Sequence, residues 1–271
     1  MLHCNNANNA GENQWMPSLS TIFSIHSKHL SLQEIISENK GFTIVPLSDR
    51  SLLVSFGNTI DPLISGQVLI LHHSLQQNSF HGFIESVPAY ASLAVFYDVI
   101  IIRKMTGIAA FAFVKNLLLQ RLQQNHPTAQ QLPVIKEIPV CYDDDFGFDI
   151  GHVAHIHGIN VHEVISLHTS ILYQVYMIGF MPGFAYMGAV AEKLITPRKH
   201  QPSPMVPAGS VGIAGAQTGI YPLQSPGGWQ IIGRTPLHLF DAASASPCLL
   251  AAGDRVQFVS INKKEFEAYG H

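Results

Sequence analysis

The sequence predicts an α+β protein, in which a domain that mixes helices and strands is followed by a domain made mainly of strands. The first observation is that strand-like and helical patterns alternate over residues 42–130. The second is an uncharged segment, 200–233, whose apolar residues recur between glycines, as in short strands joined by tight turns. The third is a polar, proline-bracketed stretch at 125–133, which has the composition of a linker. Together they predict two domains, 42–130 and 134–265.

The first domain begins with a predicted hairpin. Two runs typical of strands, 42–47 and 51–57, are separated by the short polar turn Ser-Asp-Arg. Asp61 followed by Pro62 predicts the start of a helix, because aspartate caps helices and proline is tolerated in the first turn. The runs GFIES and YASLAVFYD predict two more strands, and GIAAFAFVKNLLLQRLQQ predicts a second helix. Residues 1–41, rich in Asn, Ser and His, are expected to form an N-terminal extension with the composition of a disordered segment.

The second domain is predicted to be a β-barrel or a β-sandwich. It opens with the strand KEIPVCY, and two short helices follow. Asn160 and Glu163 have the spacing of a capping box and mark the start of the second helix. From LYQVYMIGF onward the signals are strands and Gly/Pro turns, which close with LHLF and RVQFVSI.

Charge and cysteine usage exclude several classes of function. Fifteen Lys and Arg against eighteen Asp and Glu give a net charge of -3, with no basic block, so no nucleic-acid partner is expected. The three cysteines form no Cys-x-x-Cys pair, which favours a reducing cytoplasm over a disulfide framework. The N-terminus lacks the pattern of a secretion signal, and the apolar runs are too short to span a bilayer, so no membrane association is predicted.

The segment GHVAHIHGINVHEVISLH is the densest cluster of titratable side chains. It contains no His-Glu-x-x-His pattern, and Gly158 separates its two helices, so we predict no metal site. His168, at the end of a helix and just before a strand, is the best-placed candidate for a catalytic role. The alternative is a capping or core histidine.

The glycine-rich segment is not a nucleotide-binding motif. GSVGIAG spaces its glycines as G-x-x-G-x-x-G, and no Gly-x-x-x-x-Gly-Lys-Ser/Thr loop exists in the chain, so no cofactor motif is predicted. Ser210 and Thr218 are possible nucleophiles, but neither lies in Gly-x-Ser-x-Gly, and turn hydroxyls usually bond the local backbone.

The charges that bracket the uncharged segment suggest an anion site. Arg198 precedes it, and Arg234 and Asp241 follow it. Guanidinium groups at the rim of a pocket lined by peptide N–H groups suit a carboxylate or a phosphate. The alternative is a strand-end arginine that pairs with Asp241.

Several long motifs closely resemble a known family. They are DRSLLVSFG and VPAYASLAVFYD upstream, and YQVYMIGFMPGFAYMG, the run from TPRKHQPSPMVPAGS to TPLHLFD, and LLAAGDRVQF downstream. Over roughly residues 42–261 the chain is similar to the family of the B subunit of 5-oxoprolinase. That family also includes the KipI-type kinase inhibitors and allophanate hydrolase subunit 1.

The resemblance implies an N-terminal α+β domain and a C-terminal cyclophilin-like β-barrel. It also implies a cytoplasmic bacterial protein that acts with partner subunits A and C and is inactive alone. The implied activity is the opening of the small molecule 5-oxoproline to L-glutamate with ATP, and with Mg²⁺ in the complex. We expect the ring amide to be activated, most simply by phosphorylation of its oxygen, and Arg and peptide N–H groups to stabilise the developing negative charge.

We therefore assign expected roles to eight residues. The catalytic candidates are His168, Arg234 and Asp241. The substrate-binding candidates are Arg198, Ser210, Gly215, Gln217 and Thr218.

One departure from the family pattern bears on the substrate. The family usually has a second Pro-Arg before VPAGS, where this chain has Pro202-Ser203. Lys199 is expected to substitute for the missing arginine as a less directional cation, or the substrate differs. PGFAYMG in place of the usual PGFPYLG is expected to change packing only.

Three other functions are alternatives. A KipI-like chain inhibits a sensor histidine kinase, and binding to a purified kinase dimerisation domain distinguishes it. An allophanate hydrolase subunit 1 acts in urea degradation, which a neighbouring biotin-carboxylase gene favours. Prolyl isomerase activity rests on fold analogy alone.

Overall fold

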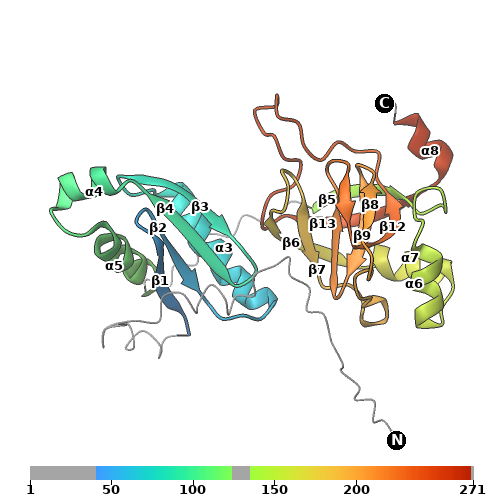
Figure 1. Cartoon of the computed structure of the whole chain (residues 1–271), viewed down its shortest axis with the longest axis horizontal. Helices are drawn as coiled ribbons and strands as arrows, with labels where there is room; N and C mark the ends of the chain where they lie inside the picture. The colour runs from blue at the N-terminus through green and yellow to red at the C-terminus, as the bar shows by residue number, and fades with distance from the viewer. Residues whose placement is uncertain (1–40, 124–134, 270–271) are drawn as a thin grey trace, which may run out of the picture. The chain divides into compact units, whose positions relative to one another are not determined.

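The computed structural model describes residues 41–123 and 135–269 (Figure 1). It contains a four-stranded sheet with helices and a closed seven-stranded barrel with helices, which confirms the α+β class. The predicted extension lies outside the described residues except for its last one, and the whole of the predicted linker lies outside them. The boundary between the two predicted domains stays a prediction. No helix in the described ranges is long and apolar enough to cross a membrane.

The four-stranded sheet has the order β1-β2-β4-β3 and is antiparallel throughout. Its strands are β1 (Thr43–Ser48), β2 (Ser51–Ser55), β3 (Phe83–Pro88) and β4 (Ser92–Tyr97), and its helices are α3 (Pro62–Gln77), α4 (Val99–Thr106) and α5 (Ala110–Gln123). The hairpin β1-β2 and the start of α3 are confirmed. The Asp61 carboxylate accepts hydrogen bonds from the backbone N–H groups of Leu63 and Ile64, at 2.7 and 3.1 Å.

Helix α4 was not predicted from the sequence. Its residues Val-Ile-Ile-Ile continue the strand-like run of β4 in composition, because β-branched side chains favour strands. Asp98 breaks the run, since its carboxylate accepts from the N–H groups of Ile100 and Ile101 and caps a helix there.

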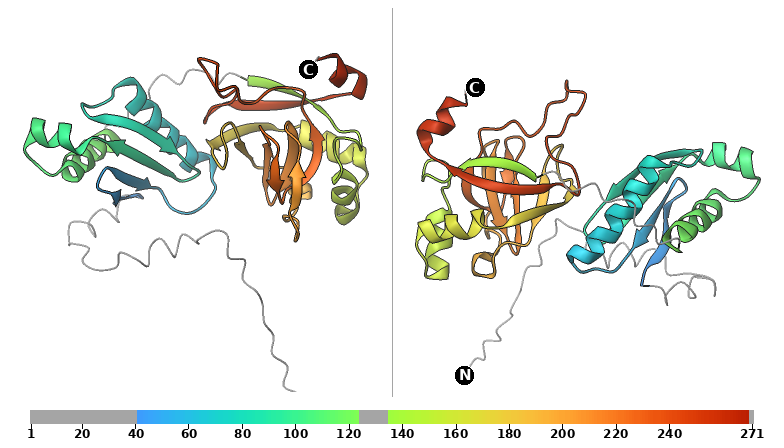
Figure 2. Two further views of the ribbon diagram at one scale, coloured as in Figure 1. Left: turned by 45° about the horizontal axis from the view of Figure 1, so that its top comes forward. Right: turned by 180° about the vertical axis from the view of Figure 1, so that it is seen from behind.

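The barrel has the circular order β10-β7-β6-β13-β5-β12-β9. Its strands are β5 (Ile135–Cys141), β6 (Leu172–Ile178), β7 (Ala185–Gly188), β9 (Ser210–Ala214), β10 (Gln217–Ile220), β12 (Gln230–Arg234) and β13 (Arg255–Ile261). β13 pairs with β5 in parallel along its whole length, and the two strands run side by side in Figure 2. This parallel pair joins the first and last strands of the barrel in sequence order, so it closes the barrel.

Two helices and a short ribbon accompany the barrel. Helices α6 (Ile150–His157) and α7 (Val161–Thr169) lie between β5 and β6 in sequence, as predicted. Asn160 caps α7 by accepting from the N–H of Glu163, but the Glu163 carboxylate pairs with Lys193 at 3.4 Å. Strands β8 (Ser203–Val206) and β11 (Ser225–Gly227) form a separate ribbon.

Two predictions near the C-terminus were wrong or incomplete. The run LHLF is not a strand, because Phe240 makes only an isolated bridge to Cys248. Helix α8 (Lys263–Ala268) was not predicted, although Asn262 and Glu265 form a complete capping box at its start.

Candidate functional site

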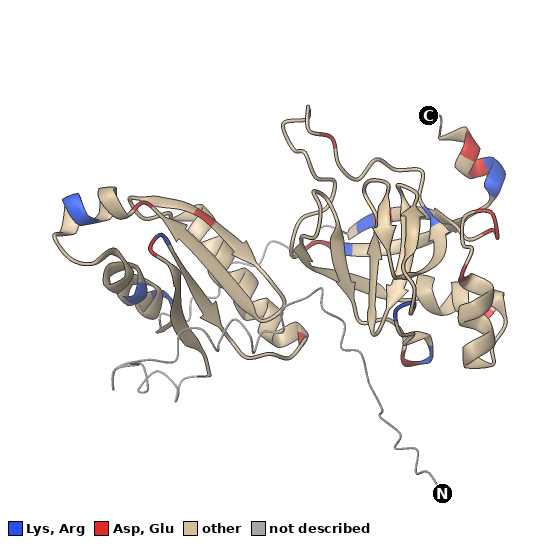
Figure 3. Ribbon diagram, in the orientation of Figure 1, with Lys and Arg blue, Asp and Glu red and all other residues tan. Residues whose placement is uncertain are grey.

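The uncharged segment forms strands that are packed on both faces. Strands β8 to β11 carry no charged side chain, and their ribbons are tan in Figure 3. Val211, Ile213 and Ile220 belong to the main barrel core, whereas Ala214 belongs to a second cluster. Because successive side chains of a strand point to opposite faces, the second cluster lies on the outer face of these strands.

Aromatic rings make up most of this second cluster. We call Phe184, Tyr186, Tyr221 and Trp229 the aromatic cluster. Phe184 lies edge-on to Tyr221 and Trp229, with ring centroids 5.2 and 5.5 Å apart. Tyr186 lies 4.7 Å from Phe184 and 5.9 Å from Trp229. These distances are typical of stabilising aromatic pairs.

Glycines allow the aromatic cluster to approach the strands. A Cβ at Gly219 would lie 3.1 Å from ring atoms of Phe184, and one at Gly212 would lie 3.1 Å from the Cβ of Trp229. The glycine-rich composition of the segment is therefore explained at these positions by ring packing. It does not require free peptide N–H groups.

Arg198 brings a positive charge to the aromatic cluster. Its exposed guanidinium lies over the ring of Trp229, 5.9 Å from the centroid. No described carboxylate forms an ion pair with it. Burial raises the pKa of Tyr221 to about 12, while the Arg198 charge acts in the opposite direction. Arg198 therefore offers an unpaired cation, which suits a small anion such as a carboxylate, at the edge of a cluster in which Tyr186 is half-buried and the other three rings are buried.

An exposed aromatic residue extends the cluster. Phe180 is 65% exposed and has a φ of 69°, which bulky residues adopt rarely. Its ring meets that of Phe184 edge-on, with centroids 5.7 Å apart. Strained backbone of this kind is often found at functional sites.

Lys199, expected to replace the missing arginine, is already paired. Its ammonium lies 2.6 Å from the Asp149 carboxylate and donates to the Ser203 hydroxyl at 3.1 Å. Asp149 therefore neutralises the charge of Lys199, whereas the neighbouring Arg198 has no ion-pair partner among the described residues.

His168 and Thr218 meet inside the barrel. His168 is fully buried and stacks on Phe258, with ring centroids 4.5 Å apart. Its Nδ1 lies 2.8 Å from the Tyr142 hydroxyl and its Nε2 lies 3.0 Å from Oγ1 of Thr218. Burial lowers the pKa of His168 to about 3, so the ring is neutral. This geometry is that of a core histidine, the alternative considered from the sequence, and its catalytic role stays a prediction.

Ser210 and Arg234 are opposite each other on β9 and β12. The Ser210 hydroxyl is buried and has no hydrogen-bond partner. Arg234 is half-buried, and its Nε donates to the Ala208 carbonyl at 2.7 Å. The two side chains therefore share one face of the sheet, because directly opposed residues do.

The remaining candidates are spread over the barrel. The N–H of Gly215 donates to the Thr196 carbonyl at 2.6 Å, so this peptide group is not free to bind a ligand. Gln217 is half-buried on β10, opposite Ala214. Asp241 is exposed in a loop, where its carboxylate accepts from the N–H of Ala243, and it forms no ion pair with Arg234.

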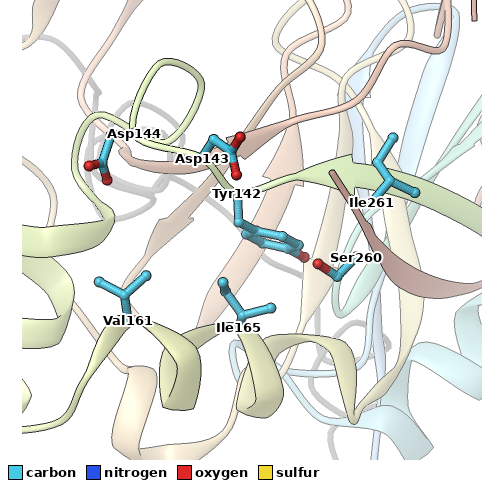
Figure 4. A pocket seen from close by; sticks show the side chains of 7 residues that line it. All are labelled: Tyr142, Asp143, Asp144, Val161, Ile165, Ser260 and Ile261. Carbon is cyan, nitrogen blue, oxygen red and sulfur yellow. The ribbon is translucent and has the colours of Figure 1, made fainter. Parts of the chain in front are cut away.

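A separate cavity of about 420 Å³ contains none of the predicted site residues. It is lined by Tyr142, Asp143, Asp144, Val161, Ile165, Ser260 and Ile261 (Figure 4). Figure 4 shows the two carboxylates on one side and the apolar side chains of α7 on the other. Across residues 41–123 and 135–269, no group of three His, Cys, Asp or Glu side chains is placed to hold a metal ion.

The sequence indicated Arg198 but not its surroundings. Trp229 and Tyr186 were part of recognised motifs, yet nothing in their spacing showed that they would meet. Asp149 was missed because it is distant in sequence from Lys199. The glycines at 212 and 219 were the one available signal, since glycine in a strand often marks a close approach.

Comparison with known proteins identifies the family. The model of the carboxyltransferase domain, subdomain C and D, matches residues 42–250. The B subunit of 5-oxoprolinase from Bacillus subtilis is 44% identical over 231 residues, which are 84% of this chain and 96% of that protein. The protein of the same name from Haemophilus influenzae is 40% identical over 216 residues, 80% of this chain and 96% of that protein.

A solved structure agrees with this assignment. The crystal structure of TTHA0988 superposes with a TM-score of 0.67 at 36% identity. The match covers 79% of this chain and 40% of that one, so this chain spans less than half of the solved protein. The chain therefore belongs to the family of 5-oxoprolinase B subunits.

Proposed function

We propose that this chain is the B subunit of an ATP-dependent 5-oxoprolinase, which opens 5-oxoproline to L-glutamate together with partner subunits A and C in the bacterial cytoplasm. The observation that carries the proposal is the 44% identity over 96% of a relative of that name. The exposed and unpaired Arg198 supports it, because 5-oxoproline carries a carboxylate.

Arg198 is the residue that we propose to bind the substrate carboxylate. A guanidinium binds a carboxylate through two parallel hydrogen bonds. Tyr186, the half-buried ring of the aromatic cluster, is proposed to contact the lactam. Gln217 is proposed to orient the ring amide. Arg234 is proposed to stabilise the negative charge that develops on the amide oxygen.

The reaction requires activation of the ring amide. ATP transfers its terminal phosphoryl group to the lactam oxygen and leaves as ADP. A first water then adds to the carbon that bears this oxygen, and the ring C–N bond breaks as the nitrogen takes a proton, which leaves an acyl phosphate of glutamate. A second water hydrolyses the acyl phosphate, so that phosphate leaves and L-glutamate remains. The chain has no phosphate-binding loop in its sequence, so we assign ATP and Mg²⁺ to the complex and to no residue of this chain.

The test is glutamate release from 5-oxoproline and ATP by the reconstituted three-subunit mixture, with this chain present, omitted or substituted. Arg198→Ala is expected to raise KM about 10- to 100-fold, because it removes a charged hydrogen-bond donor. Arg198→Lys gives an intermediate KM, since lysine keeps the charge without the planar fork. Lys193→Ala, an exposed cation on the same domain, is the control and leaves KM unchanged.

Glutamate release that is unaffected by omission of the chain contradicts the proposal. If well-folded subunits release no glutamate, inhibition of a histidine kinase and hydrolysis of allophanate are the activities to assay next.

A further inference from the structure

We infer that the ion pair of Asp149 and Lys199 positions Arg198 over Trp229, and so sets the affinity of this site for an anionic substrate. The inference rests on the proposed function for its substrate. Its structural part concerns this chain alone.

Arg198 is held from both sides by the residues that flank Trp229. The carbonyl of Pro197 accepts from Nε2 of Gln230 at 3.1 Å. The N–H of Lys199 donates to the carbonyl of Gly228 at 2.7 Å. Two hydrogen bonds thus join the segment of Arg198 to the segment of Trp229, one on each side of the contact between these two side chains.

Asp149 ties this junction to the barrel. Its Oδ2 lies 2.6 Å from the Lys199 ammonium and accepts from the N–H of Ile231 at 2.7 Å. Its own N–H donates to the carbonyl of Ile231 at 2.8 Å. Asp149 thus connects Lys199 to strand β12 two residues beyond Trp229.

The Asp149 carboxylate contacts Lys199 and Ile231 instead of capping helix α6. Asp149 directly precedes helix α6, where aspartate usually caps the helix. Here its side chain makes no capping hydrogen bond. The carboxylate is directed to Lys199 and Ile231 instead, which indicates that the contact with the Arg198 segment is its main role.

Burial makes the ion pair stronger than a surface pair. The side chains of Lys199 and Asp149 are 18% and 16% exposed, whereas those of Lys193 and Glu163 are 68% and 39% exposed. Loss of one partner leaves the other charge partly desolvated and free to reorient. The Lys193–Glu163 pair therefore provides a matched control on the same barrel.

The first test is kinetic and uses the reconstituted complex. Asp149→Asn keeps an acceptor for Ile231 and removes the charge, and it is expected to raise KM for 5-oxoproline about tenfold with kcat within about twofold. Lys199→Met gives the same result, Lys199→Arg restores KM to within about threefold, and Lys193→Met has no effect.

The decisive comparison uses the Arg198→Ala background. If Asp149 acts through Arg198, Asp149→Asn changes KM there by less than about twofold. An equal rise of KM in both backgrounds, or no rise in either, overturns the inference. If Asp149→Asn does not fold, Lys199→Met supplies the comparison, because it leaves the bonds between Asp149 and Ile231 intact.

The second test needs no activity. The chain has two tryptophans, Trp15 and Trp229, so Trp15→Phe leaves one reporter. In the isolated chain, Asp149→Asn is expected to raise the iodide quenching constant of Trp229 about twofold, because the covering segment loosens. An unchanged quenching constant contradicts positioning. If the complex releases no glutamate, the proposed function fails and this measurement alone decides the role of Asp149.

Discussion

The Nε2 atom of His168 lies 3.0 Å from Oγ1 of Thr218, inside the barrel. Oγ1 of Thr218 donates to the Gly212 carbonyl at 3.0 Å, so it accepts the proton of Nε2. Nδ1 therefore accepts from the Tyr142 hydroxyl at 2.8 Å. The ring is fixed in one neutral tautomer, and each nitrogen has a protein partner.

The buried histidine makes stability depend on pH. Burial lowers the pKa of His168 from 6.5 to about 3, so between these values the unfolded chain binds a proton that the folded chain does not. As the pH is lowered from 6.5 towards 3, the free energy of unfolding is therefore expected to decrease, by up to about 1.4 kcal/mol per pH unit from this group. Above pH 6.5, His168 makes no contribution to the pH dependence. Urea unfolding at several pH values, followed by Trp229 fluorescence in the Trp15→Phe background, measures this slope.

His168→Gln is the variant for this prediction. Glutamine keeps one donor and one acceptor but does not titrate. The dependence of the free energy of unfolding on pH below 6.5 is therefore expected to decrease by the contribution of about one proton, about 1.4 kcal/mol per pH unit. His162→Gln, at an exposed position of the same helix, is the control. An unchanged slope in the His168 variant contradicts the assignment. The pH dependence of stability that comes from His72 persists in this variant, because burial also lowers the pKa of this histidine, on helix α3, to about 4.

Thr218→Val is expected to destabilise the barrel by about 1–3 kcal/mol. The substitution is close in shape and leaves the Nε2 proton of His168 buried without an acceptor. Tyr142→Phe is expected to cost a similar amount, since it removes the donor to Nδ1. Tyr269→Phe, at an exposed position, serves as the control. A loss below about 0.5 kcal/mol in both core variants would show that these hydrogen bonds contribute little.

Gly219→Ala is expected to destabilise the barrel and to weaken the Arg198 site. The new Cβ would lie 3.0 Å from the Ala185 carbonyl and 3.1 Å from the ring of Phe184, and overpacking of this kind costs about 1–3 kcal/mol. Gly151→Ala is the matched control, because nothing lies within 4 Å of its Cβ in helix α6. The control is expected to stabilise by about 0.5–1 kcal/mol. The prediction is confirmed if the denaturation midpoint decreases in Gly219→Ala and increases in Gly151→Ala. Shifts of the two midpoints in the same direction contradict it.

Local signals of the sequence predicted most of the fold. The Asp61-Pro62 start of α3 and the hairpin before it depend on neighbouring residues, and both are confirmed. The resemblance to a known family supplied the barrel. Helix α4 was missed because its isoleucines favour strands, and only the cap at Asp98 indicates a helix. Composition and local capping gave opposite signals there, and capping prevailed.

The site was less predictable because it depends on contacts between distant segments. The flanking charges drew attention to Arg198, whose role in substrate binding stays a prediction. Its ring partner Trp229 and the pairing of Lys199 with Asp149 follow from the strand order of the barrel, which no local pattern contains. The expectation of free peptide N–H groups failed at Gly215, because Thr196 pairs with it.

Ser210→Ala separates a structural from a functional role for Ser210. Its hydroxyl is buried without a hydrogen-bond partner, which is unfavourable in the folded state. Removal of the hydroxyl is therefore expected to leave the free energy of unfolding unchanged or to raise it by about 1 kcal/mol, in contrast to Thr218→Val. Urea unfolding of the isolated chain measures this difference. If the hydroxyl binds substrate, KM for 5-oxoproline rises in the complex although stability does not fall. If stability falls by more than about 1 kcal/mol, the hydroxyl has a partner such as a buried water, and its proposed role in substrate binding loses its basis.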